Sequence, residues 1–278
     1  MAEYRSLALD RVQPLKLIPE LQTTRELEVI LNNRLWIARN WPYPHVVARN
    51  VFAQQFYAAM EAEFNSILQK GLSECSNSGQ FSRVVAGYDT YGIGLGDSAG
   101  GALSIFGSPG WHDLIADLFE VEASGQVNIG VHHHRIGSQS GWIHNDFNPV
   151  WFPADSAGRI RHPDHARCDY KTGAGPLSSS EKIEVVRAVA MIFYLCNNGW
   201  KEGDGGETGL FESLVLGDPC RRIVPESNSI LLFECTPRSY HTFLANPGLA
   251  RNSIIMWIHR DMQGTLERWP EHSLERWC

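Results

Sequence analysis

The chain has 278 residues, of which 43% are hydrophobic and 20% are charged, and its formal net charge is −7. This acidic balance argues against a nucleic-acid partner, because nucleic-acid-binding proteins usually carry a basic face. No apolar stretch is long enough to cross a bilayer, and the first five residues do not begin a signal peptide. The six cysteines lack CxxC spacing and are expected to be reduced thiols. We therefore expect a soluble, cytoplasmic, globular protein that binds neither membrane nor nucleic acid.

The N-terminal part, residues 1–125, is predicted to be a region of helices and strand that packs on a catalytic core. Apolar side chains recur at helical spacing over 26–39, 46–70 and 111–121, which predicts three helices. Residues 82–95 alternate between apolar and polar and are predicted to form a strand.

The hydrophobic period changes to two at residue 126, and this pattern defines the predicted core, residues 126–262. Short apolar runs separated by glycine and proline turns predict eight strands, near 127–136, 142–147, 186–196, 208–212, 221–224, 229–234, 240–245 and 252–259. Many short strands of this kind favour an α+β protein with a jelly-roll core backed by N-terminal helices.

Two segments do not follow the strand pattern. Residues 148–180 form an irregular insert with several prolines and glycines, and a loop this long in a compact domain is expected to be a lid or mobile. Residues 263–278 are predicted to be a short amphipathic tail.

A candidate metal site lies in the second predicted strand, at Gly141-Trp142-Ile143-His144-Asn145-Asp146. Residues two apart on a strand point to the same face, so His144 and Asp146 would project side by side. His241 is the best candidate for a third ligand, and Arg251 follows ten residues later. Two histidines and one carboxylate, with open coordination positions, are the ligand set of non-haem Fe(II) oxygenases. An arginine nearby would offer a fixed cation to a dicarboxylate co-substrate.

This spacing resembles that of the 2-oxoglutarate/Fe(II) dioxygenases, in the prolyl-4-hydroxylase-like branch. Three further stretches resemble motifs of that branch and occur in its order. They are Ile192-Phe193-Tyr194-Leu195 followed by Trp200, Gly205-Gly206-Glu207-Thr208-Gly209-Leu210-Phe211, and the strand from Pro225 to Phe233. The resemblance spans roughly residues 127–260 and implies a double-stranded β-helix core.

The resemblance also implies roles for individual residues. His144, Asp146 and His241 would bind Fe(II), and Arg251 would bind the distal carboxylate of 2-oxoglutarate with help from Tyr194. A guanidinium can take a carboxylate through two hydrogen bonds, and a phenol can add a third donor.

The run His132-His133-His134-Arg135 is a second cluster of polar side chains. Consecutive residues on a strand point to opposite faces, so the three histidines cannot bind one ion together. Most of them are expected to be inward polar or solvated residues. The family often has a tyrosine nine or ten residues before the first metal histidine, where this chain has His134 or Arg135. Arg135 is a candidate contact for the 1-carboxylate of 2-oxoglutarate or for an acidic group on the substrate.

The expected function is Fe(II)- and 2-oxoglutarate-dependent hydroxylation of an unactivated C–H bond, with O2 as the second co-substrate. A small molecule, an amino acid or a metabolite derived from one, is the expected substrate, and a peptide or protein side chain is the alternative. Chlorinating relatives have a small residue where this chain has Asp146, so its carboxylate argues for hydroxylation. Desaturation and cyclisation stay open, as do a jelly-roll isomerase or lyase that needs no 2-oxoglutarate and a non-catalytic binding protein. The sequence does not predict an oligomeric state.

Overall fold

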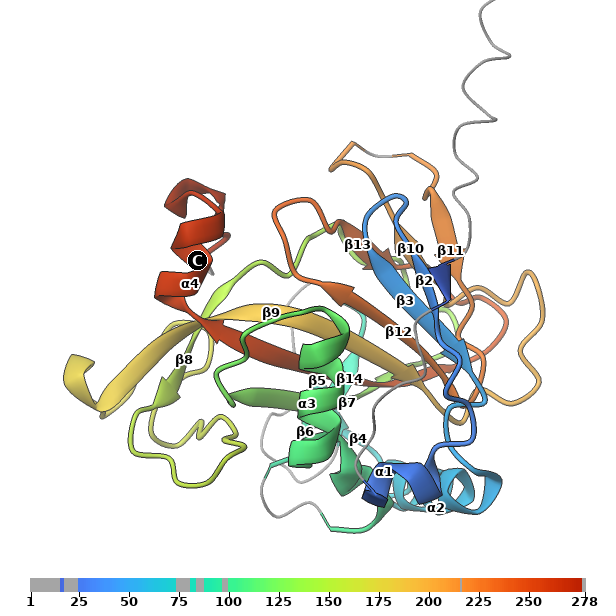
Figure 1. Ribbon diagram of the computed structural model, residues 1–278. Helices are drawn as coiled ribbons and strands as arrows, with labels where there is room; N and C mark the ends of the chain where they lie inside the picture. The colour runs from blue at the N-terminus through green and yellow to red at the C-terminus, as the bar shows by residue number, and fades with distance from the viewer. Residues whose placement is uncertain are drawn as a thin grey trace, which may run out of the picture.

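The structure is a computed structural model that describes residues 16–17, 25–73, 81–83, 88–96, 100–215 and 217–276. Its described strands form two sheets, a large one of 11 strands and a small one of three. Figure 1 shows the large sheet crossing the molecule, with the helices of the N-terminal part on one side of it and the small sheet and the C-terminal helix on the other. This α+β arrangement, with a double-stranded β-helix core, confirms the predicted fold class.

The large sheet has the order β1-β2-β3-β12-β9-β14-β7-β6-β5-β4, with β8 paired to β9 off this path, and the small sheet has the order β11-β10-β13. The strands are β1 Lys16–Leu17, β2 Ile37–Arg39, β3 His45–Arg49, β4 Leu72–Ser73, β5 Phe81–Arg83, β6 Tyr91–Gly94, β7 Val127–His134, β8 Pro149–Pro153, β9 Lys182–Tyr194, β10 Thr208–Leu210, β11 Arg221–Ile223, β12 Ser229–Glu234, β13 His241–Phe243 and β14 Arg251–Asp261.

Four α-helices and three 3-10 turns accompany the described strands. They are α1 Arg25–Ile30, α2 Gln54–Leu68, α3 Pro109–Leu118, α4 Met262–Arg268, η1 Ala102–Gly107, η2 Ser179–Glu181 and η3 Glu271–Ser273. Across the described ranges, no helix is long and apolar enough to cross a membrane.

The central strand β9 is buried on both faces, so its sequence is an almost continuous apolar run. One face of β9 carries Met191 and Phe193 into the core shared with α2 and α3. The other face carries Ala190 and Ile192 toward the small sheet. This second face is one wall of the space between the two sheets, where the candidate site lies.

Several predicted N-terminal boundaries are wrong. The helix predicted over 26–39 ends at Ile30, and residues 37–39 form β2. Asn33 ends the helical run because its side-chain oxygen accepts a hydrogen bond from the Leu35 amide, which turns the chain. The helix predicted over 46–70 begins only at Gln54, because residues 45–49 pair with β12 and β2 instead.

The strand predicted over 82–95 is two strands, β5 and β6, and residues 84–87 between them lie outside the described residues. The insert predicted to be irregular over 148–180 begins with a regular strand, β8, that pairs with β9. The tail predicted over 263–278 contains α4 and η3.

The strand predicted over 142–147 is absent as a regular element. His144 forms one isolated antiparallel bridge with His241, and Asp146 has a φ of 58°, in the left-handed region. The Asn145 side chain accepts a hydrogen bond from the Phe147 amide and stabilises this turn. The candidate ligands His144 and Asp146 are therefore brought together by a bridge followed by a turn, and not by strand alternation.

A buried histidine on β3 gives a prediction for acid stability. Burial lowers the pKa of His45 to about 4, and only 1% of the residue is exposed. An unfolded histidine has a pKa near 6.5, so between these values the unfolded chain binds more protons and the folded state loses stability as the pH falls. We expect the free energy of unfolding, measured with urea, to fall between pH 6.5 and 4 more steeply in the wild type than in His45→Asn. One proton corresponds to about 1.4 kcal/mol per pH unit, and equal slopes would refute the assignment.

Candidate metal centre

Two histidines face each other across the isolated bridge between the 142–146 segment and β13. The His144 amide donates to the His241 carbonyl at 3.1 Å, and the His241 amide donates to the His144 carbonyl at 2.8 Å. This reciprocal pair holds the two imidazole rings 4.4 Å apart, centre to centre. The backbone itself therefore sets the spacing of the two side chains.

Both imidazoles point their Nε2 atom into the site. Nδ1 of His144 lies 2.9 Å from the Trp142 carbonyl oxygen, and Nδ1 of His241 lies 3.0 Å from the Ser239 carbonyl oxygen. A carbonyl only accepts hydrogen bonds, so each Nδ1 carries a proton, and Nε2 is the atom through which the neutral ring can bind a metal. Burial lowers the pKa of His144 to about 4, which keeps this ring neutral at physiological pH.

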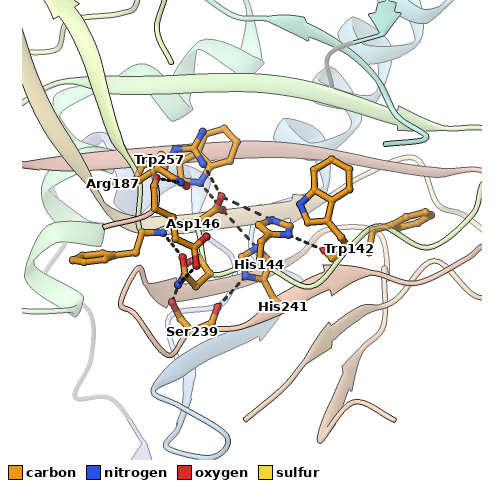
Figure 2. Close-up of polar contacts among 12 residues, drawn as sticks. Trp142, His144, Asp146, Arg187, Ser239, His241 and Trp257 are labelled. Atoms are coloured by element: carbon orange, nitrogen blue, oxygen red, sulfur yellow. Dashed lines mark hydrogen bonds and ion pairs between the residues drawn. The ribbon is translucent and has the colours of Figure 1, made fainter. Parts of the chain in front are cut away.

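Asp146 completes the cluster. Its Oδ1 lies 3.9 Å from Nε2 of His144, and its Oδ2 lies 3.5 Å from Nε2 of His241. Burial alone would raise the pKa of this carboxyl, but the adjacent Arg187 guanidinium holds it well below its usual range. Figure 2 shows Asp146 between the two imidazoles and a second pair of side chains, Arg187 and Trp257.

These donors fit a divalent iron ion. One nitrogen or oxygen from each of the three residues lies within 4.8 Å of the others, and in the described part of the chain no other group of three or more such residues does this. Two imidazole nitrogens and one carboxylate on one side of an ion leave coordination positions for a co-substrate and O2.

Arg251 begins β14 and lies in the same cavity. Only 3% of it is exposed, its Nη2 donates to Oγ1 of Thr208 at 3.3 Å, and its Nε has no hydrogen-bond partner. Gly206 allows this approach, since a Cβ there would come within 3.2 Å of the Arg251 Cβ. A buried guanidinium with a free N–H is suited to an anionic ligand.

The structure brings some, but not all, of the predicted site residues into one cavity. A cavity of about 440 Å³ is lined by His144, Asp146, His241 and Arg251. Tyr194 does not line it, and its hydroxyl instead lies 2.6 Å from Oγ1 of Thr208. This places Tyr194 behind the wall of the cavity, one hydrogen bond away from it.

Arg135 lies outside the cavity. It is exposed, and its guanidinium donates to the Tyr91 hydroxyl at 2.6 Å. The structure therefore does not bring Arg135 to the other candidate residues. Two neighbours from the same run, His132 and His134, line the cavity instead, as alternation along β7 requires.

The sequence analysis missed two side chains that hold Asp146. Arg187 donates from Nη1 to Oδ1 of Asp146 at 2.6 Å, and the Trp257 indole donates to Oδ2 at 2.8 Å. The signal for Arg187 was present, because it is the one charged residue between Val185 and Leu195 in an apolar strand. A buried charge in such a run requires a buried partner.

Comparisons with known proteins point to the same class of enzyme. Residues 166–259 match the profile of the 2OG-Fe(II) oxygenase superfamily. The chain carries a 2OG-Fe(II) oxygenase domain. It is a 2-oxoglutarate-dependent dioxygenase, and this family uses Fe(II), 2-oxoglutarate and O2. No curated protein sequence matches the chain.

Solved structures show the same fold as this oxygenase. A Pseudomonas putida prolyl-4-hydroxylase is 14% identical, with a TM-score of 0.53, and the match covers 78% of this chain and 92% of that one. A Trichoplax adhaerens prolyl hydroxylase, in complex with a hypoxia inducible factor peptide fragment, is 15% identical, with a TM-score of 0.51. That match covers 81% of this chain and 87% of the other. At these identities the likeness is one of fold.

Proposed function

We propose that this oxygenase hydroxylates an unactivated C–H bond of a small molecule, an amino acid or a metabolite derived from one. In this proposal His144, Asp146 and His241 bind Fe(II), and Arg251 binds the distal carboxylate of 2-oxoglutarate. The catalytic core is residues 126–262, with the 148–180 insert beside the site and the described part of residues 1–125 packed against the core. The observation that carries the proposal is the presence of the three ligands and a buried arginine in one cavity.

Each residue has a defined task in this arrangement. When bound, Fe(II) supplies the activation of O2 while 2-oxoglutarate is oxidised to succinate and CO2. The two Nε2 atoms and the Asp146 carboxylate hold the ion, and Arg251 orients the co-substrate toward it. Thr208 and Tyr194 support Arg251 from behind, through the hydrogen bonds at 3.3 and 2.6 Å. Apolar side chains of the wall, among them Ile192 and Phe233, exclude water from the site.

The mouth of the cavity supports an amino acid as substrate. Lys171 of the insert lines the cavity with positive charge, and Glu275 of the tail lines it with negative charge, whereas Arg276, which also lines it, is paired with Glu184. A free amino acid carries one ammonium and one carboxylate, so both of its charges have an opposite charge at this mouth. A residue within a peptide lacks both charges.

A matched panel tests this substrate class. Succinate release from 2-oxoglutarate would be measured with Fe(II) in the presence of each free amino acid, of the same amino acid as its N-acetyl amide, and of prolyl peptides. His241→Ala protein is the blank. We expect at least one free amino acid to stimulate release several-fold and its blocked form to have little effect. Stimulation by blocked amino acids or peptides alone would contradict a small-molecule substrate and favour a peptide hydroxylase.

The proposal includes a cytoplasmic location. The four described cysteines, Cys168, Cys196, Cys220 and Cys235, are free, and Cys75 and Cys278 lie outside the described residues. Disulfides are rare in the reducing cytoplasm, so free thiols are compatible with it.

A further inference from the structure

A line of buried hydrogen bonds leads away from Asp146 to the insert. Arg187 bonds Asp146 through Nη1, and its Nε donates to the Tyr170 hydroxyl at 3.2 Å. That hydroxyl lies 2.9 Å from Nε2 of His259. Nδ1 of His259 in turn lies 2.8 Å from the Gln126 carbonyl oxygen. These side chains are at most 5% exposed, so water does not compete for their bonds.

The direction of every bond in this line is fixed. The Gln126 carbonyl only accepts, so His259 carries its proton on Nδ1 and accepts at Nε2. Burial lowers the pKa of His259 to about 3, which keeps the ring neutral. Tyr170 must therefore donate to His259, which leaves its oxygen lone pairs to accept from Arg187. A reversed arrangement would leave a buried donor without an acceptor.

The backbone brings these residues together at an irregularity in the central sheet. The pairing of β14 with β9 shifts register between Ile258 and His259, and beyond the shift His259 pairs with Arg187. Such bulges re-aim side chains. The Arg187 guanidinium also lies 4.0 Å above the Trp257 ring, the same indole that bonds Asp146.

Tyr170 belongs to the 148–180 insert, whereas Arg187 and His259 belong to the sheet. The Tyr170 carbonyl accepts from the Trp151 amide at 2.8 Å, and its ring packs 5.6 Å from Phe152, both on β8. We propose that Tyr170 is a positioning residue, through which the insert fixes the Arg187 side chain and thereby the orientation of the Asp146 carboxylate for iron. This inference rests on the proposed role of Asp146 as a metal ligand.

The physical consequence is a link between the insert and metal affinity. The Arg187 guanidinium is held at both Nε and Nη1 and so has one orientation. It fixes the Asp146 carboxylate in one position, so that the side chain need not be ordered when the ion binds. Without the phenol, Arg187 keeps its bond to Asp146 and its contact with the Trp257 ring but loses the bond at Nε, so the Asp146 carboxylate is held less firmly. Loss of a hydrogen-bond partner directly behind a ligand typically weakens metal binding 10–100-fold. Tyr170 acts one bond further away, so we expect a weakening of about three- to tenfold.

Tyr170→Phe tests this link by removing one hydroxyl and nothing else. The dissociation constant for Mn(II), a redox-stable probe for the iron site, would be measured calorimetrically on metal-free protein without 2-oxoglutarate or substrate. Tyr57→Phe is the matched control, because the Tyr57 hydroxyl also donates once, to Glu61, and accepts once, from the Cys196 amide. Tyr57 is 4% exposed and Tyr170 3%, so both changes remove a buried hydroxyl.

We expect Tyr170→Phe to raise the Mn(II) dissociation constant three- to tenfold and Tyr57→Phe to leave it within about twofold of wild type. Equal constants for Tyr170→Phe and wild type would overturn the inference. An equal rise in both variants would also overturn it, because general destabilisation would then explain the effect. The wild type must bind Mn(II) saturably, and His241→Ala must abolish this binding. Its absence would refute the proposed metal site, which distinguishes that failure from failure of the Tyr170 link.

Arg187→Lys supplies a second, independent variant. It keeps the positive charge beside Asp146 but loses the planar fork that joins Asp146 to Tyr170. We expect Arg187→Lys to weaken Mn(II) binding at least as much as Tyr170→Phe does. Adding Tyr170→Phe to Arg187→Lys should then cause no further loss, since the link is already broken. If the losses of Mn(II) affinity were additive in the double variant, Tyr170 would not act on Asp146 through Arg187.

Discussion

Asp146→Ala is expected to abolish 2-oxoglutarate turnover and to lower the free energy of unfolding of the metal-free protein by about 3–5 kcal/mol. Turnover is lost because the only carboxylate of the proposed ligand set is gone. Stability is lost because Arg187, 4% exposed, keeps its charge in the interior after its partner at 2.6 Å is removed. Urea unfolding and succinate release measure the two effects separately.

Two further variants show whether the buried pair is the cause. His241→Ala should also abolish turnover but destabilise less, because it leaves no uncompensated charge. Asp146→Ala combined with Arg187→Met should recover much of the lost stability while remaining inactive, since replacing both partners of a buried pair by apolar groups is often neutral or better. If Asp146→Ala alone were as stable as wild type, the ion pair would have no role in holding the site.

Arg251→Lys is expected to weaken 2-oxoglutarate binding about ten- to a hundredfold, which corresponds to the loss of one good charge-assisted hydrogen bond of about 1.5–3 kcal/mol. Lysine keeps the charge but not the two-pronged geometry of the guanidinium. Metal affinity should hardly change, because Arg251 is not a ligand. Titration of 2-oxoglutarate at saturating Fe(II) measures the first effect, and Mn(II) calorimetry the second.

Tyr194→Phe is expected to have a smaller effect of the same kind. The Tyr194 hydroxyl bonds Thr208 and does not line the cavity, so we expect a smaller rise in the 2-oxoglutarate requirement than with Arg251→Lys. Unchanged dependence on 2-oxoglutarate in both Arg251→Lys and Arg251→Ala would refute the co-substrate assignment.

The strands of the core could be predicted from the sequence because burial gives them a clear pattern. β7, β9, β12 and β14 all lie where apolar runs or alternation predicted them. The N-terminal segments were harder, since Val46 and Val47 fit a helical spacing as well as a strand. Their pairing with β12, nearly 200 residues away, decides between the two, and no local pattern contains that information.

In the site, too, some features could be predicted from local sequence and others depend on residues that meet only in the folded chain. The histidines and Asp146 could be named from their spacing, but the left-handed turn at Asp146 depends on the Asn145 side chain and was not foreseen. The roles of Arg187, Trp257 and Tyr170 were not predicted either, because each meets its partner only after the sheet has formed. The position of Arg135 outside the cavity follows from the end of β7, where the chain turns away at Gly137.

In the proposed function, the His144, Asp146 and His241 cluster binds iron, and Arg251 holds 2-oxoglutarate beside it. The most direct measurement is succinate formed from 2-oxoglutarate under air by metal-free protein reconstituted with Fe(II), compared with His241→Ala and Arg251→Ala. We expect Fe(II)-dependent succinate from the wild type, none above background from His241→Ala, and recovery of part of the activity of Arg251→Ala at high 2-oxoglutarate. Succinate formation that is equal in the wild type and His241→Ala, or absent from the wild type with every substrate of the panel, would refute the proposed iron site.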